Sequence, residues 1–263
     1  MSLGLLTGPL GIPRLEESAF PFLTSFFGFS LLYLTLFRLS PQLVPRTYGA
    51  LKPVQQINWN IHVVSMVHCA IALPIAFRLL ARGALQDDRI FGYDRDVADS
   101  MAISLGYFIW DAIVSIRHIR SFGPEFCLHG VACSAIFLQG YQPFFMSFGP
   151  IFLLYEISTV FLNIHWFMDK CGLSDSLAQS LNGIILLLSF FFSRILYGTY
   201  QSVVVYVDLF RVRDQISTGL FWLLAFSNLL LMSLNFLWFS KMLSMVQRRF
   251  FSSDPPAKPI KAE

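Results

Sequence analysis

Several apolar runs of about twenty residues constrain this chain more than any other feature, because a helix needs roughly that length to cross a bilayer. Hydrophobic residues make up 55% of the 263 residues and charged residues only 13%, about half the charged share of an average soluble domain. No polar block as large as a soluble domain separates the runs. We therefore expect an all-α, polytopic membrane helical bundle with about seven transmembrane helices. The expected spans are residues 20–37, 57–80, 97–116, 126–139, 144–168, 177–207 and 220–242.

The fourth expected span, residues 126–139, is short, so it is either buried inside the bundle or spans with help from its neighbours. Seven spans place the two ends of the chain on opposite sides of the membrane. Lys and Arg are more frequent on the side of the C-terminus, which predicts that this end is cytosolic. Residues 251–263 are rich in Pro and Lys and are expected to form a disordered cytosolic tail. Residues 1–18 lack the pattern of a cleavable signal peptide.

Charge and cysteine content argue against several functional classes. The formal net charge is only +3, and the basic residues lie in loops and in the tail, so we expect no nucleic-acid partner. The four cysteines are scattered without a CxxC pair, and no cluster has the spacing of a zinc site, so we predict neither a metal nor a resident cofactor. No serine nucleophile elbow indicates a hydrolase.

The expected span at residues 144–168 carries polar side chains in an otherwise apolar run. At helical spacing these share one face, which holds Glu156, Thr159, Asn163 and Trp166. A carboxyl group at mid-span costs several kcal/mol unless it is neutral, paired or beside a wet cavity, so this face should turn toward other helices. By depth alone, the candidate partners of Glu156 are His68 and Arg194. Such a group is either a functional site or a polar network that fixes helix packing.

Two further residues are candidates for chemistry. His129 lies in the short fourth span, and a histidine can act as a base or a nucleophile near neutral pH. Asp111 lies in the third expected span at a depth similar to that of His129, so its carboxylate could orient that histidine. The structural alternative for both residues is a hydrogen bond that only holds helices together.

Five motifs together resemble the TLC-domain family of membrane proteins. The most specific is Glu156-Ile157-Ser158-Thr159-Val160-Phe161-Leu162-Asn163, which is similar to the family's Glu-x-Ser-Thr-x-Phe-Leu-Asn helix. The others are Asn58-Trp59-Asn60 with the following Ser65-Met66-Val67-His68, then Gly106-Tyr107-Phe108-Ile109-Trp110-Asp111, His129, and Phe192-Ser193-Arg194-Ile195. The resemblance implies a leading helix in residues 1–47, a six-helix TLC domain in residues 48–250, and a location mainly in the endoplasmic reticulum, with the plasma membrane as the alternative.

The resemblance is closer to the small TLC-domain-containing proteins than to the ceramide synthases. Ceramide synthases carry a pair of histidines and two acids three residues apart, whereas this chain has Leu128 before His129 and Thr159 three residues after Glu156. The small proteins are linked to membrane lipid composition, which implies a role in lipid homeostasis with membrane lipids as partners. Self-association into a homo-oligomer stays open.

Two functional alternatives accompany this interpretation. The first is a ceramide synthase-like N-acyltransferase that joins a sphingoid base to fatty acyl-CoA, with His129, Glu156 and Asp111 as the catalytic candidates. The second is a small-molecule transporter, which the buried charges favour, although no inverted repeat is evident. The residues expected to form a lipid cavity or a structural polar network are His68, Ser158, Thr159, Asn163 and Arg194.

Overall fold

The computed structural model describes residues 17–251, with side chains up to residue 248, and every regular element in that range is helical. The disordered tail predicted for residues 251–263 therefore lies almost entirely outside the described residues. The same holds for residues 1–18, which lack a signal-peptide pattern. The longer elements are α1 (Ala19–Leu43), α3 (Pro53–Ala81), α4 (Arg95–Arg117), α6 (Pro124–Phe137), α8 (Glu156–Lys170), α9 (Leu177–Phe190), α10 (Tyr197–Arg211) and α11 (Thr218–Phe251). The short ones are α2 (Pro45–Gly49), α5 (Ile119–Phe122), η1 (Leu138–Tyr141), α7 (Phe148–Leu153), η2 (Phe191–Leu196) and η3 (Arg213–Gln215).

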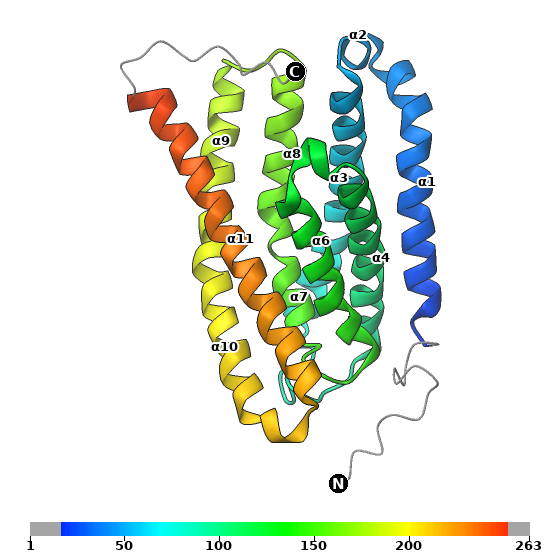
Figure 1. The fold of residues 1–263 in the computed structure, drawn as a ribbon, viewed down its shortest axis with the longest axis vertical. Coiled ribbons are helices and arrows are strands. Elements are labelled where there is room, and N and C mark those ends of the chain that lie inside the picture. The colour runs from blue at the N-terminus through cyan, green and yellow to red at the C-terminus, as the bar shows by residue number, and fades with distance from the viewer. Residues whose placement is uncertain (1–16, 252–263) are drawn as a thin grey trace.

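The helices form one up-and-down bundle, in which the chain passes from one end to the other seven times (Figure 1). Six of these passes are long and apolar enough to cross a membrane. The seventh is α6, whose 14 residues span about 21 Å and fall short of a hydrocarbon core of about 30 Å. It packs between α4 and α11. The predicted all-α polytopic bundle is confirmed, and the short fourth pass is a helix that buries one face against α4 and α11 and leaves the other exposed.

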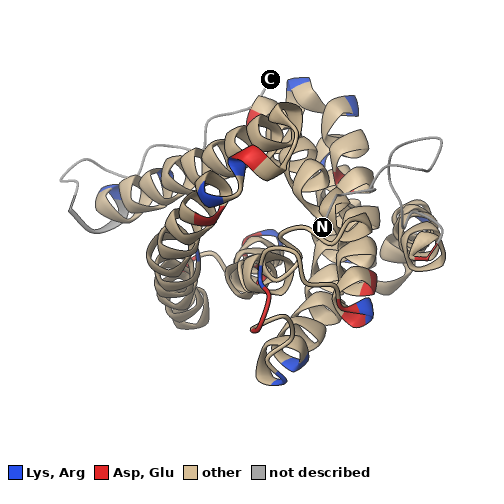
Figure 2. Cartoon of the chain, turned by 90° about the horizontal axis from the view of Figure 1, so that it is seen from below, with Lys and Arg blue, Asp and Glu red and all other residues tan. Residues whose placement is uncertain are grey.

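Local sequence explains where several helices begin. The Asp94 side chain accepts a hydrogen bond from the backbone N–H of Val97 at 3.1 Å, and this caps the start of α4. Ser176 caps α9 in the same way through Gln179 at 3.1 Å. Proline stands in the first turn of α6, where its missing N–H leaves no helical hydrogen bond unmade. Most of the length of the helices carries no Lys, Arg, Asp or Glu (Figure 2).

Two of the expected spans are not regular helices. The span predicted at residues 144–168 is α7 followed by α8, joined at Leu154 and Tyr155 by a tight turn. The span predicted at residues 177–207 was expected to weaken at Gly183 or Gly198. Its irregular segment is instead the π-helical turn η2, which holds Arg194. A π-turn inserts an extra residue into the hydrogen-bond ladder and is frequent at functional sites.

At the lower end of Figure 1 the α3–α4 connection is fastened to α10. Arg89 donates two hydrogen bonds to the fully buried carboxylate of Asp208, at 2.5 and 2.7 Å. This carboxylate raises the pKa of the Arg89 guanidinium. Nearby, the Ser147 hydroxyl donates to the Arg89 carbonyl at 2.8 Å. These bonds hold the ends of α3, α7 and α10 together at the lower end of the bundle.

Candidate functional site

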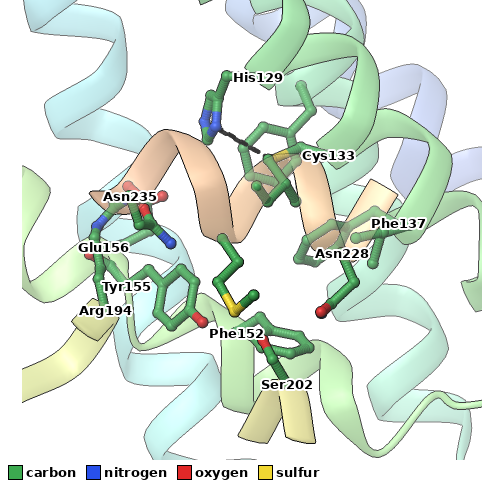
Figure 3. A pocket seen from close by; sticks show the side chains of 14 residues that line it. His129, Cys133, Phe137, Phe152, Tyr155, Glu156, Arg194, Ser202, Asn228 and Asn235 are labelled. Carbon is green, nitrogen blue, oxygen red and sulfur yellow. Dashed lines mark hydrogen bonds between the residues drawn. The ribbon is translucent and has the colours of Figure 1, made fainter. Parts of the chain in front are cut away.

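A cavity that is open on one side lies between α6, α8, η2, α10 and α11 (Figure 3). The centre of a water molecule can occupy about 40 Å³ of it, and the space between its walls reaches about 550 Å³ when solvent at the open side is counted. Aromatic and aliphatic side chains form much of its wall, as in ligand pockets generally. Polar groups from five different helical segments also reach it. The lining residues are Phe108, His129, Cys133, Ile136, Phe137, Phe152, Tyr155, Glu156, Arg194, Ser202, Asn228, Leu231, Met232 and Asn235.

Arg194 connects three walls of this cavity. Its guanidinium donates to the hydroxyls of Ser158 and Thr159, both at 2.9 Å. It also donates to the Tyr155 carbonyl and to the Asn235 side-chain oxygen, both at 3.2 Å. The side chain is only 8% exposed. The predicted network of Ser158, Thr159 and Arg194 is thus in contact, and it ties η2 to α8 and to α11.

Glu156 begins α8 and is buried beside α3. Its Oε2 atom accepts a hydrogen bond from the Cys69 thiol at 3.1 Å and lies 3.9 Å from Nδ1 of His68. The His68 ring stacks on Tyr107 with centroids 3.9 Å apart. His68 was expected near Glu156 and is found there. Arg194 was the other expected partner, but its hydrogen bonds go to other residues, and no direct ion pair joins it to Glu156 within the described chain.

His129 lines the cavity from α6. Within the described residues its hydrogen-bonding contacts are with Cys133, whose sulfur is 3.7 Å from both ring nitrogens. Asp111 is not among the described residues that line the cavity, and no hydrogen bond or ion pair joins it to His129 within the described chain. Leu128 is 45% exposed on the outer side of α6. The acid expected to orient His129 therefore makes no direct contact with it, while His129 and Glu156 share the cavity.

Asn163 serves a separate contact, outside the cavity. Its side chain is 1% exposed, its oxygen lies 2.7 Å from Nδ1 of His62, and its nitrogen donates to Ser65 at 3.1 Å. The His62 ring in turn stacks on Trp166. These contacts fasten α8 to α3 over one turn of each helix. Asn163 thus belongs to a packing network rather than to the cavity wall.

Sequence reasoning did not predict Cys133, Tyr155, Ser202, Asn228 and Asn235 as site residues. The two asparagines lie one heptad apart on an apolar helix, and this spacing is the signal that could have found them. Ser202 and Cys133 are small residues without such a signal. Within the described chain, no group of three or more His, Cys, Asp or Glu side chains could hold a metal ion.

Comparison with known proteins places the chain in a family. The family pattern described as TLC domain matches residues 58–244. An uncharacterised TLC domain-containing protein of Schizosaccharomyces pombe is 33% identical over 207 residues, which cover 77% of this chain and 70% of that protein. Topoisomerase I damage affected protein 4 of Saccharomyces cerevisiae is 28% identical over 201 residues, or 74% and 72% of the two chains.

A vertebrate relative extends the likeness to the small TLC proteins. TLC domain-containing protein 4-A of Xenopus laevis is 32% identical over 181 residues, which cover 65% of this chain and 68% of that protein. No solved structure matches the chain. The resemblance inferred from the motifs is confirmed: this chain belongs to the TLC domain family of integral membrane proteins, among relatives named TLC domain-containing proteins.

Proposed function

We propose that this protein acts in membrane lipid homeostasis by holding a lipid molecule in its internal cavity. The observation that carries the proposal is a cavity with apolar walls into which polar groups project without a partner. The side-chain oxygen of Asn228 is buried and accepts no hydrogen bond from the described residues. A buried polar group in this state costs about 1–3 kcal/mol. A lipid with a polar head would satisfy that group and fill the apolar space together.

The burial of Arg194 and Glu156 supports the same proposal. Charged residues inside a membrane protein face its interior or a cavity and mark ligand pathways more often than they mark simple packing. Arg194 lines the cavity from η2, which interrupts regular helix, and Glu156 lines it from the first residue of α8, directly after the α7–α8 turn. Irregular backbone at membrane depth is tolerated where it lines a cavity.

The proposal is tested by identifying lipid that stays bound to the purified full chain. The protein is extracted in a mild detergent, and weakly bound lipid is removed by dilution alone. The lipids that the protein retains are then identified by mass spectrometry. Ser202→Leu places a larger apolar side chain into the cavity from α10. Val203→Leu is the matched control, because Val203 is 56% exposed on the outer surface of the same helix.

We expect one lipid class to be retained in stoichiometric amount by the parent and by Val203→Leu, and to be lost from Ser202→Leu. In cells that express the chain, the same substitution should abolish any change in membrane lipid composition that the parent causes. Equal retention by all three proteins would mean that the lipid coats the outer surface, and the proposal would then be wrong.

A second candidate function is N-acyl transfer from fatty acyl-CoA to a sphingoid base. The observation in its favour is that His129 and Glu156 line one cavity, so a base or nucleophile and an acid would face the same substrate. Purified protein is given a sphingoid base and a panel of acyl-CoAs, with His129→Ala alongside. Turnover that disappears in His129→Ala would establish the enzyme, and turnover that survives it would exclude His129 from the reaction.

We further propose that the protein resides in the endoplasmic reticulum with its C-terminus in the cytosol. The excess of Lys and Arg on the side of the C-terminus supports this orientation. A C-terminal epitope should be detected by antibody after selective permeabilisation of the plasma membrane. Detection only after full permeabilisation would reverse the orientation.

A further inference from the structure

The charged groups of the cavity are largely occupied by the protein itself. A guanidinium has five N–H groups, and Arg194 donates four hydrogen bonds, to Ser158, Thr159, the Tyr155 carbonyl and Asn235. A phosphate or carboxylate ligand needs two free parallel N–H groups for the usual bidentate contact. Arg194 cannot offer such a pair without giving up its contacts with α8 or α11. It therefore belongs to the wall and is poorly suited to bind an anionic head.

The free polar groups of the cavity are uncharged. The hydroxyls of Tyr155 and Ser202 and the amide of Asn228 line the cavity, and none of the three groups makes a hydrogen bond within the described part of the chain. In Figure 3 these three side chains lie in the lower part of the view, below His129, with Tyr155 and Asn228 on opposite sides and Ser202 at the bottom. Together they can both donate and accept hydrogen bonds.

A glycine in α10 gives this group its arrangement. The Tyr155 ring passes over Gly198, where an added Cβ would meet the hydroxyl end of the ring. Gly198 precedes Ser202 by four residues, so both lie on the same face of α10. The hydroxyl of Tyr155 is thereby held beside the turn that carries Ser202, and Asn228 faces them from α11.

The depth of this group also favours an uncharged ligand. Ser202 lies nine residues before the end of α10 and Asn228 ten residues after the start of α11, which puts both about 14–15 Å from the lower end of the bundle. That is close to the middle of a hydrocarbon core about 30 Å thick. A charged head at this depth would be unfavourable without a free counter-charge, and the cavity offers none that is not already engaged.

We propose that the cavity selects an uncharged lipid with a free hydroxyl group, of the diacylglycerol type, whose head lies among Tyr155, Ser202 and Asn228. This inference rests on the proposed lipid-holding function and adds the chemical class of the lipid. Phe108, Phe137 and the other apolar lining residues form the wall that the start of the acyl chains would contact, and the rest of the chains would leave through the open side of the cavity.

The test compares three lipids with the same acyl chains and different heads. Purified full-length protein in nanodiscs is titrated with dioleoylglycerol, with its 3-O-methyl ether and with dioleoyl phosphatidic acid, and binding is followed by native mass spectrometry. We expect dioleoylglycerol to bind about tenfold more tightly than the methyl ether, which lacks the hydroxyl donor, because one hydrogen bond of this kind changes affinity by about that factor. Phosphatidic acid should bind at least as weakly as the ether.

Asn228→Leu is the decisive variant. The substitution keeps the number and branching of the side-chain heavy atoms and removes no hydrogen bond that the described protein makes. The variant should therefore fold at least as stably as the parent when no lipid is added. The variant should bind dioleoylglycerol about tenfold more weakly than the parent does, and its affinity for phosphatidic acid should be unchanged. Ser202→Ala provides a second variant with the same expected direction should Asn228→Leu fold poorly.

The outcomes separate this inference from the function on which it rests. Tighter binding of phosphatidic acid that is lost in Ser202→Leu would overturn the uncharged class and leave the lipid-holding function intact. If the parent binds none of the three lipids more tightly than Ser202→Leu does, both the uncharged lipid class and the lipid-holding function would be wrong. Tight binding of dioleoylglycerol that neither Asn228→Leu nor Ser202→Ala weakens would place its head elsewhere and refute the site.

Discussion

Replacing Arg194 with methionine should destabilise the bundle more than any single substitution of an exposed basic residue. The substitution keeps a long flexible side chain but removes the four hydrogen bonds to Ser158, Thr159, Asn235 and the Tyr155 carbonyl. It also leaves the buried acid Glu156 without the cation that shares its cavity. Both changes act on the junction between α8, η2 and α11.

The size of the expected loss in stability follows from the number of hydrogen bonds that Arg194 makes. Interhelical hydrogen bonds in membrane proteins contribute about 0.6 kcal/mol each on average, so four of them amount to about 2–3 kcal/mol. Removal of the cation adds to this, because a buried charge that loses its partner is costly. For a domain of this size about 3 kcal/mol corresponds to a fall in Tm of roughly 6–12 °C.

The assay is thermal unfolding of purified protein in one detergent, followed by fluorescence-detected size exclusion. Arg194→Lys keeps the charge but cannot reproduce a four-way guanidinium contact, so we expect it to recover less than half of the loss. Arg213→Met is the control, since the Arg213 side chain is 63% exposed. A Tm for Arg194→Met within about 2 °C of the Arg213→Met value would refute the argument that Arg194 holds the junction.

Three further predictions follow from individual contacts. Asn163→Leu should cost about 1–2 kcal/mol, because it removes both side-chain hydrogen bonds to α3, and thermal unfolding measures the loss. Gly198→Ala should displace the Tyr155 hydroxyl and reduce lipid retention in the mass spectrometric assay with a stability cost of about 1–3 kcal/mol. Arg89→Met should cost about 2 kcal/mol, because Asp208 stays fully buried without its bidentate partner, and proteolysis should then cleave the α3–α4 connection faster.

Each of these has a matched control in the same region. Leu162→Ala precedes Asn163 on an exposed position of α8 and should leave Tm nearly unchanged. Gly219→Ala introduces a Cβ with no atom within 4 Å, so it should retain lipid as the parent does. Arg82→Met breaks an ion pair whose side chains are 42% and 24% exposed, and it should change proteolysis less than Arg89→Met. Equal effects in variant and control would contradict the corresponding prediction.

The sequence was sufficient for the membrane class and for the six passes that are long enough to cross a membrane, because apolar run length maps directly onto bilayer thickness. The helix with Glu156, Thr159 and Asn163 could be predicted to turn its polar face inward for the same reason. Depth along each helix gave His68 and Arg194 as the two candidate partners of Glu156, and of these His68 lies 3.9 Å from its carboxylate. These are properties of single helices, which the sequence determines locally.

Contacts between helices could not be predicted in this way. Depth alone suggested Arg194 as a partner of Glu156, whereas the π-turn η2 rotates Arg194 toward Ser158, Thr159 and Asn235. A π-turn shifts the helical phase by a fraction of a turn, and no residue type or motif in this stretch marks where that shift occurs. Asp111 illustrates the same limit, since similar depth to His129 does not bring the two side chains into contact.

The central claim is that a lipid lies inside the bundle, and photo-crosslinking tests it most directly. A diacylglycerol with a diazirine in its acyl chain is incorporated into nanodiscs with the full chain, irradiated, and its attachment sites are mapped by peptide mass spectrometry. We predict crosslinks to the cavity walls on α6 and α11, at residues 133–137 and 231–235, that disappear in Ser202→Leu. Crosslinks confined to outward-facing positions such as Phe226 and Leu229, unchanged by Ser202→Leu, would contradict the claim.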